Sequence, residues 1–479
     1  MDAMSASGES FHSTNPATGE SVWQGRAAGN DDVDRAVATA RAAADSWAAQ
    51  PIAARTRVLL RFADQLKTHS DELTDTICRE TGKPRWESRA EVDAMASKIK
   101  LSIESHQQRR SPTETESAGT QSATRYKPHG VLAVLGPFNF PGHLPNGHIV
   151  PALLAGNSVV FKPSELAPLV AEKTHAMWIA AGLPGGALQL VQGGRATGEA
   201  LVRHPDIDGV LFTGSFTVGR AINRVLAEHP GRIAALEMGG NNALVVHHVR
   251  DMDAAAYWTI QSAFITAGQR CSCARRLILT EDSWANDFVD HLVAMTRRIV
   301  VGAYTQSPEP FMGPVISDSA AQKLMDVQRE LQAHAAGSLV EMSQAGARKG
   351  MLSPGIIDVT GVKQLADEEH FGPLLQVIRV KDFDAAIDET NRTSFGLTAG
   401  LFSDDRALYD RFYARVRAGV INFNRPLTGA SSALPFGGIG DSGNHRPSAY
   451  FAADYCSYPV ASMEAERLTL PEKRTPGIG

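Results

Sequence analysis

The residues in this sequence that could do covalent chemistry are a cysteine and a carboxylate. Cys271 lies in the run Gly268–Cys273, and Glu237 precedes it in Leu236-Glu237-Met238-Gly239-Gly240. A cysteine thiolate can attack an electrophilic carbon and form a covalent intermediate. A carboxylate can take a proton from water and so release that intermediate. The pair predicts covalent catalysis followed by hydrolysis, provided that the chain also supplies a pocket for an electrophile.

Cys271 and Glu237 also have structural interpretations. The Cys-x-Cys spacing with Cys273 could bind a metal, but zinc takes four ligands and no Cys/His cluster lies nearby in the sequence, so no metal site is expected. Cys271 could instead be a buried structural thiol, and Glu237 a salt-bridged carboxylate. Nearby arginines favour a thiolate if any of them points inward. These arginines are Arg270, Arg275 and Arg276.

A third string supplies a candidate donor for the intermediate. Pro137-Phe138-Asn139-Phe140-Pro141 holds one amide between aromatic residues and two prolines. This rigidity suits an Asn139 amide that donates to a developing oxyanion. A plain turn is the alternative.

Two further strings come where buried strands should end. In Phe212–Gly219, glycines allow close approach of a ligand, and free N–H groups at a helix start suit a phosphate. Ser215 could instead merely cap that helix. In Phe161–Glu165, the Glu165 carboxylate could accept hydrogen bonds from ribose hydroxyls, with Lys162 in support. That carboxylate would repel a 2′-phosphate and so favours NAD over NADP, whereas a solvated Lys/Glu pair is the alternative.

Composition limits the possible functions. The 479 residues suffice for two or three domains, and 43% hydrophobic with 21% charged residues is ordinary for a globular enzyme. A net charge of −5 argues against nucleic acid or an anionic membrane as the main partner. Four cysteines do not make a disulfide framework, no secretory signal is evident, and no apolar run of about 18 residues appears. A cytoplasmic enzyme is therefore expected.

The elements that must position these residues follow an α/β pattern. Helical periodicity covers 31–67 and continues to about residue 106, and a polar stretch, 111–122, reads as a surface loop or an exposed hairpin. Short apolar runs then alternate with helix-length segments, which predicts two doubly wound, parallel α/β domains that meet near Gly239-Gly240. The predicted strands are 131–135, 159–161, 188–191, 210–212, 277–279, 375–380 and 420–422; the predicted helices are 149–155, 167–181 and 196–202.

Taken together and in this order, the motifs resemble the aldehyde dehydrogenase superfamily over essentially the whole chain. Further matching strings are Asn15–Glu20, Glu80-Thr81-Gly82-Lys83-Pro84, Glu369–Pro373 and Pro435–Gly438. The resemblance implies that Cys271 is the nucleophile, that Asn139 and the Cys271 N–H hold the oxyanion, and that Glu237 is the base for deacylation. It implies NAD as cofactor, bound by Lys162, Glu165, Gly214, Ser215, Phe216, Thr217, Val218, Gly219, Glu369 and Phe371.

The resemblance also implies an organisation. It places a Rossmann-like NAD-binding domain over 1–237 and a catalytic domain over 238–430. Residues 431–479 return to the NAD-binding domain and form a β oligomerisation arm together with 111–126. Family members assemble as dimers or tetramers through such an arm, so a homodimer or homotetramer is expected.

Three strings point to a subfamily. Gly239–Asn242, Asn422–Pro426 and Gly443–Tyr450 are similar to the succinylglutamate semialdehyde dehydrogenases of the arginine succinyltransferase pathway. The implied substrate, N-succinylglutamate semialdehyde, carries two carboxylates, and Arg425 and Arg446 are candidates to pair with them. The alternatives are oxidation of succinate or glutarate semialdehyde, or a non-catalytic member of the fold. A CoA-acylating enzyme fits less well, because Glu237 is present to activate water.

Overall fold

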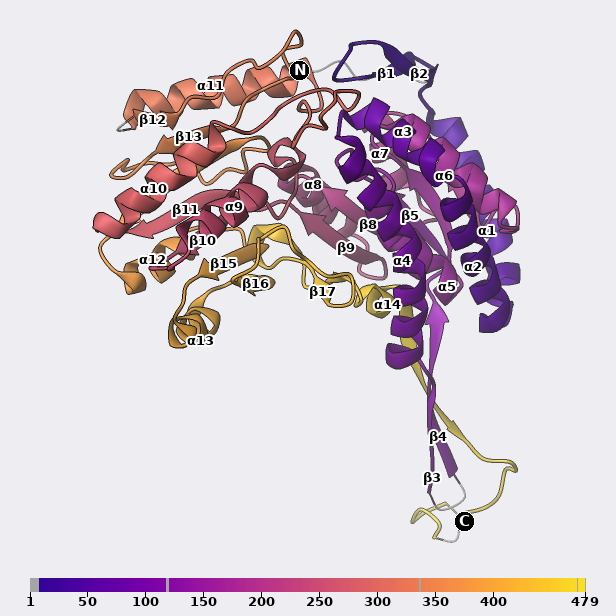
Figure 1. The fold of residues 1–479 in the computed structure, drawn as a ribbon. Helices are drawn as coiled ribbons and strands as arrows, with labels where there is room; N and C mark the ends of the chain where they lie inside the picture. The colour runs from indigo at the N-terminus through magenta and orange to yellow at the C-terminus, as the bar shows by residue number, and fades with distance from the viewer. Residues whose placement is uncertain (1–7, 118–119, 336, 472, 479) are drawn as a thin grey trace.

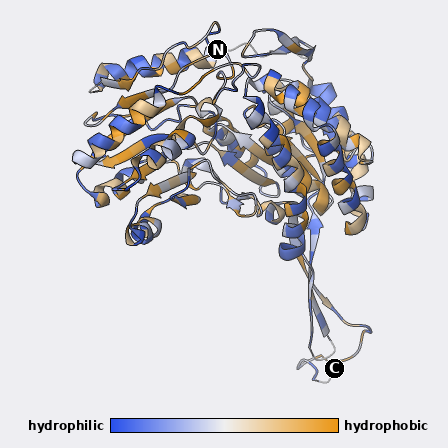
Figure 2. Ribbon diagram, in the orientation of Figure 1, coloured by the Kyte–Doolittle hydropathy of each residue, from blue (hydrophilic) through white to orange (hydrophobic). Residues whose placement is uncertain are grey.

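The computed structural model describes residues 8–117, 120–335, 337–471 and 473–478. Two sheets, each covered by helices, form two lobes that lie side by side, and a narrow β arm projects away from one of them (Figure 1). The predicted α/β class is confirmed. Hydrophobic residues concentrate on the strands, whereas the outer helix faces are largely hydrophilic (Figure 2). Within the described ranges, no helix combines the length and the apolar character needed to cross a membrane.

The first sheet has the strand order β7-β6-β5-β8-β9, and all neighbouring strands are parallel. Its strands are β5 (Val131–Leu135), β6 (Ser158–Lys162), β7 (Leu188–Leu190), β8 (Gly209–Gly214) and β9 (Ile233–Met238). The chain moves outward from β5 to β7 and then returns to β8 on the other side of β5. Ligands in open α/β sheets bind beyond the carboxyl ends of the strands at such a reversal of order.

Helices pack against this first sheet. They are α1 (Asn30–Ala48), α2 (Ile52–Thr68), α3 (Ser70–Thr81), α4 (Arg85–Arg109), α5 (His143–Ala155), α6 (Pro168–Ala180), α7 (Arg195–Arg203) and α8 (Phe216–Leu226). In α1 the buried residues include Val33, Val37, Ala40 and Ala44, which fall on one helical face. Helix α4 differs, because its buried residues include charged side chains such as Glu87 and Glu91.

The second sheet has the order β12-β13-β14-β11-β10-β15-β16, and only the β12–β13 pair is antiparallel. Its strands are β10 (Asn242–Val246), β11 (Ala274–Thr280), β12 (Gly337–Val340), β13 (Gly355–Asp358), β14 (Leu374–Val380), β15 (Thr398–Phe402) and β16 (Val420–Phe423). Its helices are α9 (Met252–Ala263), α10 (Ser283–Thr296), α11 (Asp318–His334), α12 (Phe383–Thr390) and α13 (Arg406–Arg415). The chain passes from the first sheet to the second through Gly239-Gly240, between β9 and β10.

The arm is an antiparallel sheet in the order β19-β4-β3. It combines β3 (Thr113–Ser117), β4 (Thr120–Pro128) and β19 (Ser457–Glu464). The polar stretch is therefore an exposed hairpin and not an irregular loop. Residues 118 and 119, inside the predicted arm segment 111–126, lie outside the described residues, as do residues 1–7 of the predicted NAD-binding domain and residues 472 and 479 of the C-terminal segment.

The remaining elements are short. They are β1 (Ser10–Thr14), β2 (Ser21–Arg26), β17 (Pro435–Phe436), β18 (Ser448–Ala449), α14 (Ala452–Tyr455) and the 3-10 turns η1 (Ile265–Gly268) and η2 (Gly440–Ser442).

Candidate active site

Several of the sequence-predicted residues gather at the carboxyl ends of the first sheet. Glu237 lies near the end of β9, Gly214 and Lys162 end β8 and β6, and Asn139 lies in the loop that follows β5. Since parallel strands end at one edge of a sheet, this topology brings together residues far apart in the sequence.

Cys271 lies in a tight loop between η1 and β11 of the second lobe. Thr266 and Ala267 have φ values of 59° and 51°, and Gly268 has φ 70°. A Cβ at Gly268 would stand 2.0 Å from the Gly372 carbonyl oxygen, so only glycine fits there. The loop holds Cys271 partly exposed, while protein surrounds the thiol on most sides.

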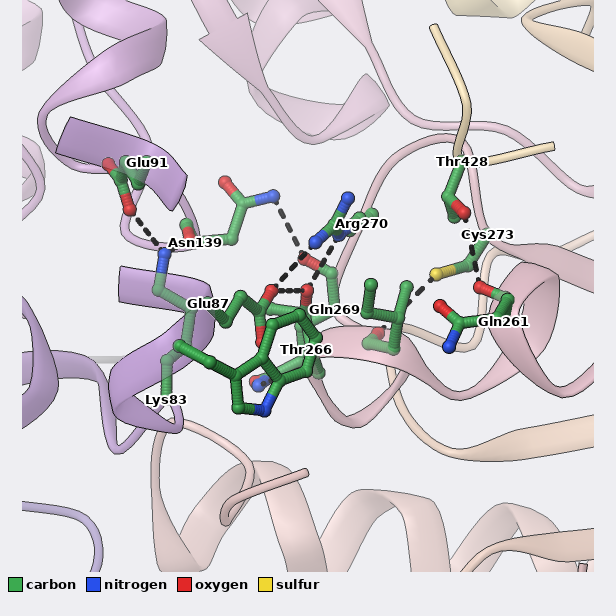
Figure 3. A network of polar contacts seen from close by, with 12 residues as sticks. Lys83, Glu87, Glu91, Asn139, Gln261, Thr266, Gln269, Arg270, Cys273 and Thr428 are labelled. Atoms are coloured by element: carbon green, nitrogen blue, oxygen red, sulfur yellow. Dashed lines mark hydrogen bonds and ion pairs between the residues drawn. The ribbon is translucent and has the colours of Figure 1, made fainter. Parts of the chain in front are cut away.

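Asn139 reaches the cysteine loop directly. Its Nδ2 donates to the Gln269 carbonyl oxygen at 2.9 Å, and its own carbonyl oxygen accepts from Lys83 Nζ at 2.9 Å (Figure 3). Asn139 is buried, and it therefore joins the first lobe to the loop that carries the nucleophile. The second proton on Nδ2 remains for another acceptor.

A residue that was not assigned a role from the sequence holds the other side of the loop. Asn242 Nδ2 donates to the carbonyl oxygens of Cys271 at 2.7 Å and Cys273 at 2.9 Å, while its Oδ1 accepts from Thr398 N–H. Asn242 belongs to a string that was noted only for its resemblance to a subfamily. An amide two residues after a glycine pair, at the predicted boundary between the domains, is the signal that could have marked it.

The resting thiol is not activated. Burial, together with the carboxylates of Glu369 and Glu237, raises the pKa of Cys271 to about 12, against a smaller opposing effect of Arg275. Of the three neighbouring arginines, only Arg275 acts on the thiol. Arg270 pairs with Glu87, and Arg276 donates to the carbonyl oxygens of Asn241, Glu389 and Thr390. Arg275 therefore favours the thiolate, as expected for an arginine that points inward, but burial outweighs its effect on the thiol pKa.

This raised pKa predicts the pH dependence of alkylation. In the protein without ligands, the rate constant for iodoacetamide modification of Cys271 should rise about tenfold per pH unit from pH 7 to 10, because the thiolate fraction grows throughout that range. Mass spectrometry of the Cys271 peptide at timed intervals measures the rate. A plateau near pH 8.5, as for an ordinary thiol with a pKa of about 8.5, would contradict the buried-thiol account.

Glu237 is a buried carboxylate: one of its oxygens accepts a hydrogen bond, and the other has no partner among the described residues. Its Oε1 accepts from the Ser448 N–H at 3.2 Å, and Oε2 has no partner among the described residues. Burial raises the pKa of Glu237 well above its usual range. Such a carboxyl takes up a proton readily, which suits a general base that acts on water. Glu237 has no salt bridge within the described part of the chain, contrary to its structural interpretation.

The lysine of the ribose string is hydrogen-bonded to backbone oxygens through two of its three N–H donors. Lys162 Nζ donates to the carbonyl oxygens of Pro163 at 2.6 Å and Gly193 at 2.7 Å, and it lies 3.9 Å from Glu165. Burial lowers the pKa of Lys162. Glu165 is half exposed and free to accept hydrogen bonds from a ligand, whereas two donors of Lys162 are already committed to backbone oxygens.

The glycine string forms the start of α8. Ser215 accepts from the Val218 N–H at 3.4 Å, so it does cap the helix, as the structural alternative proposed. The N–H groups of Phe216 and Thr217, in the first turn, have no acceptor within the helix. A Cβ at Gly214 would stand 2.5 Å from the Phe212 ring, so the backbone there is open only because glycine lacks a side chain. This geometry fits a pyrophosphate at the helix N-terminus.

Glu369 and Phe371 lie against the cysteine loop. Arg275 links them: its guanidinium lies 3.4 Å from Glu369 Oε1 and 5.3 Å from the centre of the Phe371 ring. A Cβ at Gly239 would stand 1.7 Å from Glu369 Oε2, so the carboxylate occupies the space that glycine leaves. Burial raises the pKa of Glu369. The structure thus brings both residues to the Cys271 loop.

The remaining candidate residues are two arginines and the second cysteine of the Cys-x-Cys string. Arg425 and Arg446 are exposed, and neither forms a salt bridge in the part of the chain that the structure describes. Cys273 is fully buried, with its Sγ 3.8 Å from the Ile265 carbonyl oxygen, and both it and Cys271 are free thiols (Figure 3). Across the described ranges, no group of three or more His, Cys, Asp or Glu side chains could hold a metal ion.

This chain is similar to one known family and to several dehydrogenases over nearly its full length. A model described as the aldehyde dehydrogenase family matches residues 3–459. The N-succinylglutamate 5-semialdehyde dehydrogenase of Ectopseudomonas mendocina (strain ymp) is 54% identical over 98% of this chain and 97% of its own length. That of Pseudomonas fluorescens (strain Pf0-1) is 54% identical over 99% and 97%. The structure of PnpE from Pseudomonas sp. WBC-3 has a TM-score of 0.90 and 28% identity, covering 97% of this chain and 96% of that one. A structure of PnpE in complex with nicotinamide adenine dinucleotide has the same TM-score and identity, covering 96% and 95%.

Proposed function

Because this chain belongs to the aldehyde dehydrogenase family, we propose that it oxidises N-succinylglutamate 5-semialdehyde to N-succinylglutamate with NAD. The single observation that carries the substrate is the 54% identity, over nearly the full length, to relatives that bear this activity in their names. The reaction would be a step in the breakdown of arginine.

The first half of the reaction is acylation of the cysteine. The Cys271 sulfur attacks the aldehyde carbon, and the aldehyde oxygen becomes an oxyanion held by Asn139 Nδ2 and the Cys271 N–H. NAD, which Glu369 and Phe371 would hold beside the Cys271 loop, would supply the acceptor for the hydride that leaves the thiohemiacetal carbon. The carbon is then a thioester on Cys271. Because the pKa of the resting thiol is high, its proton must pass to water as the attack proceeds, and the partial exposure of Cys271 allows this.

The second half is hydrolysis. Glu237 takes a proton from water through Oε2, the oxygen that has no partner among the described residues. The hydroxide attacks the thioester carbon, the carbon–sulfur bond breaks, and the carboxylate product leaves. The raised pKa of Glu237 moves its proton affinity toward that needed for a base near neutral pH.

NAD would be held along the ends of the first sheet. We place its pyrophosphate at the α8 N-terminus, beside Gly214, Ser215 and the first-turn residues Phe216, Thr217 and Val218. Gly219 would let the helix pack closely there, since a Cβ on it would meet Met238 at 2.4 Å. Glu165 would accept from the adenine ribose. Glu369 and Phe371 would lie at the nicotinamide end.

The same reasoning assigns the larger units. We propose residues 1–237 as the NAD-binding domain and 238–430 as the catalytic domain. Residues 431–479 would rejoin the first domain and, with 111–126, form an arm that pairs with another subunit. β3 is an edge strand with exposed side chains, so a second subunit could add to it. Sedimentation velocity tests this assignment: a monomer at micromolar concentration would rule it out.

The two carboxylates of the substrate give Arg425 and Arg446 a candidate role. Replacing either with leucine should raise KM for the diacid by about 10- to 100-fold, because a charge-assisted hydrogen bond is lost. KM for a neutral aldehyde such as propanal should stay within about twofold. Arg298→Leu, another exposed arginine, is the matched control. Equal changes in KM for both substrates would show that these arginines do not bind the substrate carboxylates.

A panel of aldehydes tests the proposed function. NADH formation is measured with N-succinylglutamate 5-semialdehyde, succinate semialdehyde, glutarate semialdehyde and propanal. The account expects the highest kcat/KM for the N-succinyl substrate. A higher kcat/KM for succinate or glutarate semialdehyde would mean that this semialdehyde is the substrate, and the proposed reaction steps would remain the same. No NADH from any aldehyde would mean a non-catalytic member of the fold.

A further inference from the structure

Helix α4 carries two buried carboxylates one turn apart, and each pairs with a cation that reaches the candidate active site (Figure 3). Glu87 and Glu91 are spaced by four residues, so they lie on the same face of the helix. Both are almost fully buried, at 1% and 2% exposure. Ion pairs this deep are not explained by stability, because the desolvation of two charges offsets most of their attraction.

Glu91 acts on the loop that carries Asn139. It pairs with Lys83 Nζ, and the same ammonium donates to the Asn139 carbonyl oxygen at 2.9 Å. The other carboxylate oxygen accepts from the Gly142 N–H at 2.9 Å and the His143 N–H at 3.1 Å. Lys83 and Glu91 thus hold the loop at Asn139 and at the residues that follow it, and so position the backbone from which the Asn139 amide extends.

Glu87 acts on the loop that carries Cys271. Its Oε1 accepts from the Arg270 guanidinium at 2.8 Å and from the Thr266 hydroxyl. Arg270 Nε also donates to Thr266 Oγ1 at 2.7 Å. Thr266 is one of the residues with positive φ, and Arg270 directly precedes the nucleophile. The cluster therefore holds the strained turn that aims the Cys271 N–H.

One aromatic ring couples the two ion pairs. Lys83 Nζ lies 4.2 Å from the centre of the Phe140 ring, and the Arg270 guanidinium lies 4.9 Å from it. Phe140 follows Asn139 in the chain, so the ring next to the amide contacts a cation from each pair. Cations near an aromatic face are attracted to it, most strongly where water is excluded.

We propose that Glu87 and Glu91 are positioning residues. They hold the two donors of the oxyanion site, the Asn139 amide and the Cys271 N–H, in place relative to each other. Glu91 acts through Lys83 on Asn139, and Glu87 acts through Arg270 on the Cys271 N–H. Neither carboxylate touches the substrate. The inference rests on the proposed function, because it needs an oxyanion that forms at Cys271.

A double-mutant cycle between Glu91 and Asn139 tests the first half. The measurement is the single-turnover rate of NADH formation at saturating aldehyde and NAD. Glu91→Gln should lower this rate about 10- to 100-fold, because a small misplacement of a catalytic donor is costly. In the Asn139→Ala background, the same change should cost less than about threefold, because the group it positions is gone. Full, additive losses in both backgrounds would overturn the proposal.

A second readout separates Glu87 from Glu91. Glu87→Gln should loosen the cysteine loop and speed iodoacetamide alkylation of Cys271 by about threefold or more, because the thiol becomes better solvated. Glu91→Gln should leave alkylation within about twofold, because it acts on the other loop. Equal alkylation rates in the wild type and Glu87→Gln would remove Glu87 from the proposal.

Controls keep the test decisive. Glu104→Gln removes an exposed ion pair with Lys100 on the same helix and should change neither rate nor alkylation. If Glu91→Gln does not fold, Lys83→Met with Glu91→Gln removes both charges of the pair, while the glutamine oxygen still accepts from the Gly142 and His143 N–H groups. That variant should keep its melting temperature and still lose the single-turnover rate, whereas an undiminished rate overturns the proposal. If wild-type protein forms no NADH, the proposed function fails instead.

Discussion

Replacing Cys271 with alanine is expected to abolish aldehyde-dependent NADH formation, with a loss of about 10⁴-fold or more in kcat. The reason is that hydride leaves only from the thiohemiacetal carbon, and alanine offers no atom to form that bond. A residual oxyanion site cannot replace the missing nucleophile. The measurement is NADH absorbance with N-succinylglutamate 5-semialdehyde at saturating NAD.

Cys273→Ala is the matched control for this variant. Cys273 lies two residues away, but its sulfur faces the Ile265 carbonyl oxygen inside the protein. It should keep kcat within about threefold and lose only a little stability, since a small buried side chain is shortened. NAD binding to Cys271→Ala, followed by fluorescence, should stay close to wild type. Activity that survives in Cys271→Ala, or vanishes equally in Cys273→Ala, would contradict the assignment of the nucleophile.

Replacing Glu237 with glutamine is expected to separate the two halves of the reaction. The variant should release about one NADH per active site in a burst, and its steady-state rate should fall about 10³-fold, because water is no longer deprotonated. Rapid-mixing absorbance at 340 nm measures both phases.

The pH profile provides a control for this prediction. Burial raises the pKa of Glu237, so the carboxylate form that acts as base forms at higher pH than in an exposed glutamate and grows as the pH rises. In the wild type, a turnover limited by hydrolysis should therefore increase with pH through that raised pKa. Glutamine cannot titrate, and the variant should lose this increase. Loss of the burst itself would mean that Glu237 takes part before the thioester forms.

The elements that position the site follow closely from sequence patterns. Continuous apolar runs such as Val131–Leu135 are typical of strands that are buried on both faces of a parallel sheet, and here the run forms such a strand. The hairpin at 113–128 was harder to predict, because its polar residues have no apolar alternation. Its two strands pair with each other, and β4 also pairs with Ser457–Glu464, over 300 residues away, which no local pattern reveals.

Motifs located the site residues, but their contacts were not predictable. The string around Lys162 predicted a ribose site, but it did not show that the ammonium also binds the backbone oxygens of Pro163 and Gly193. Arg270 was expected near a thiolate, yet Glu87 of a distant helix holds it. Such pairings depend on which lobes and helices meet, and no local pattern encodes that.

The electrostatic state of the site was likewise inaccessible from sequence. Positive neighbours in the chain suggested a low pKa for Cys271, whereas burial and two carboxylates raise it. Desolvation depends on the complete three-dimensional surroundings, and it outweighs the charges that are adjacent in sequence.

The most direct test of the central claim is the mass of the trapped intermediate. Glu237→Gln is mixed with NAD and N-succinylglutamate 5-semialdehyde, quenched in acid within the burst and digested for mass spectrometry. The account predicts that the peptide carrying Cys271 gains the mass of the N-succinylglutamyl acyl group, and that Cys271→Ala gains none. NADH release without an acyl group on Cys271, or an acyl group on Cys273 instead, would contradict it.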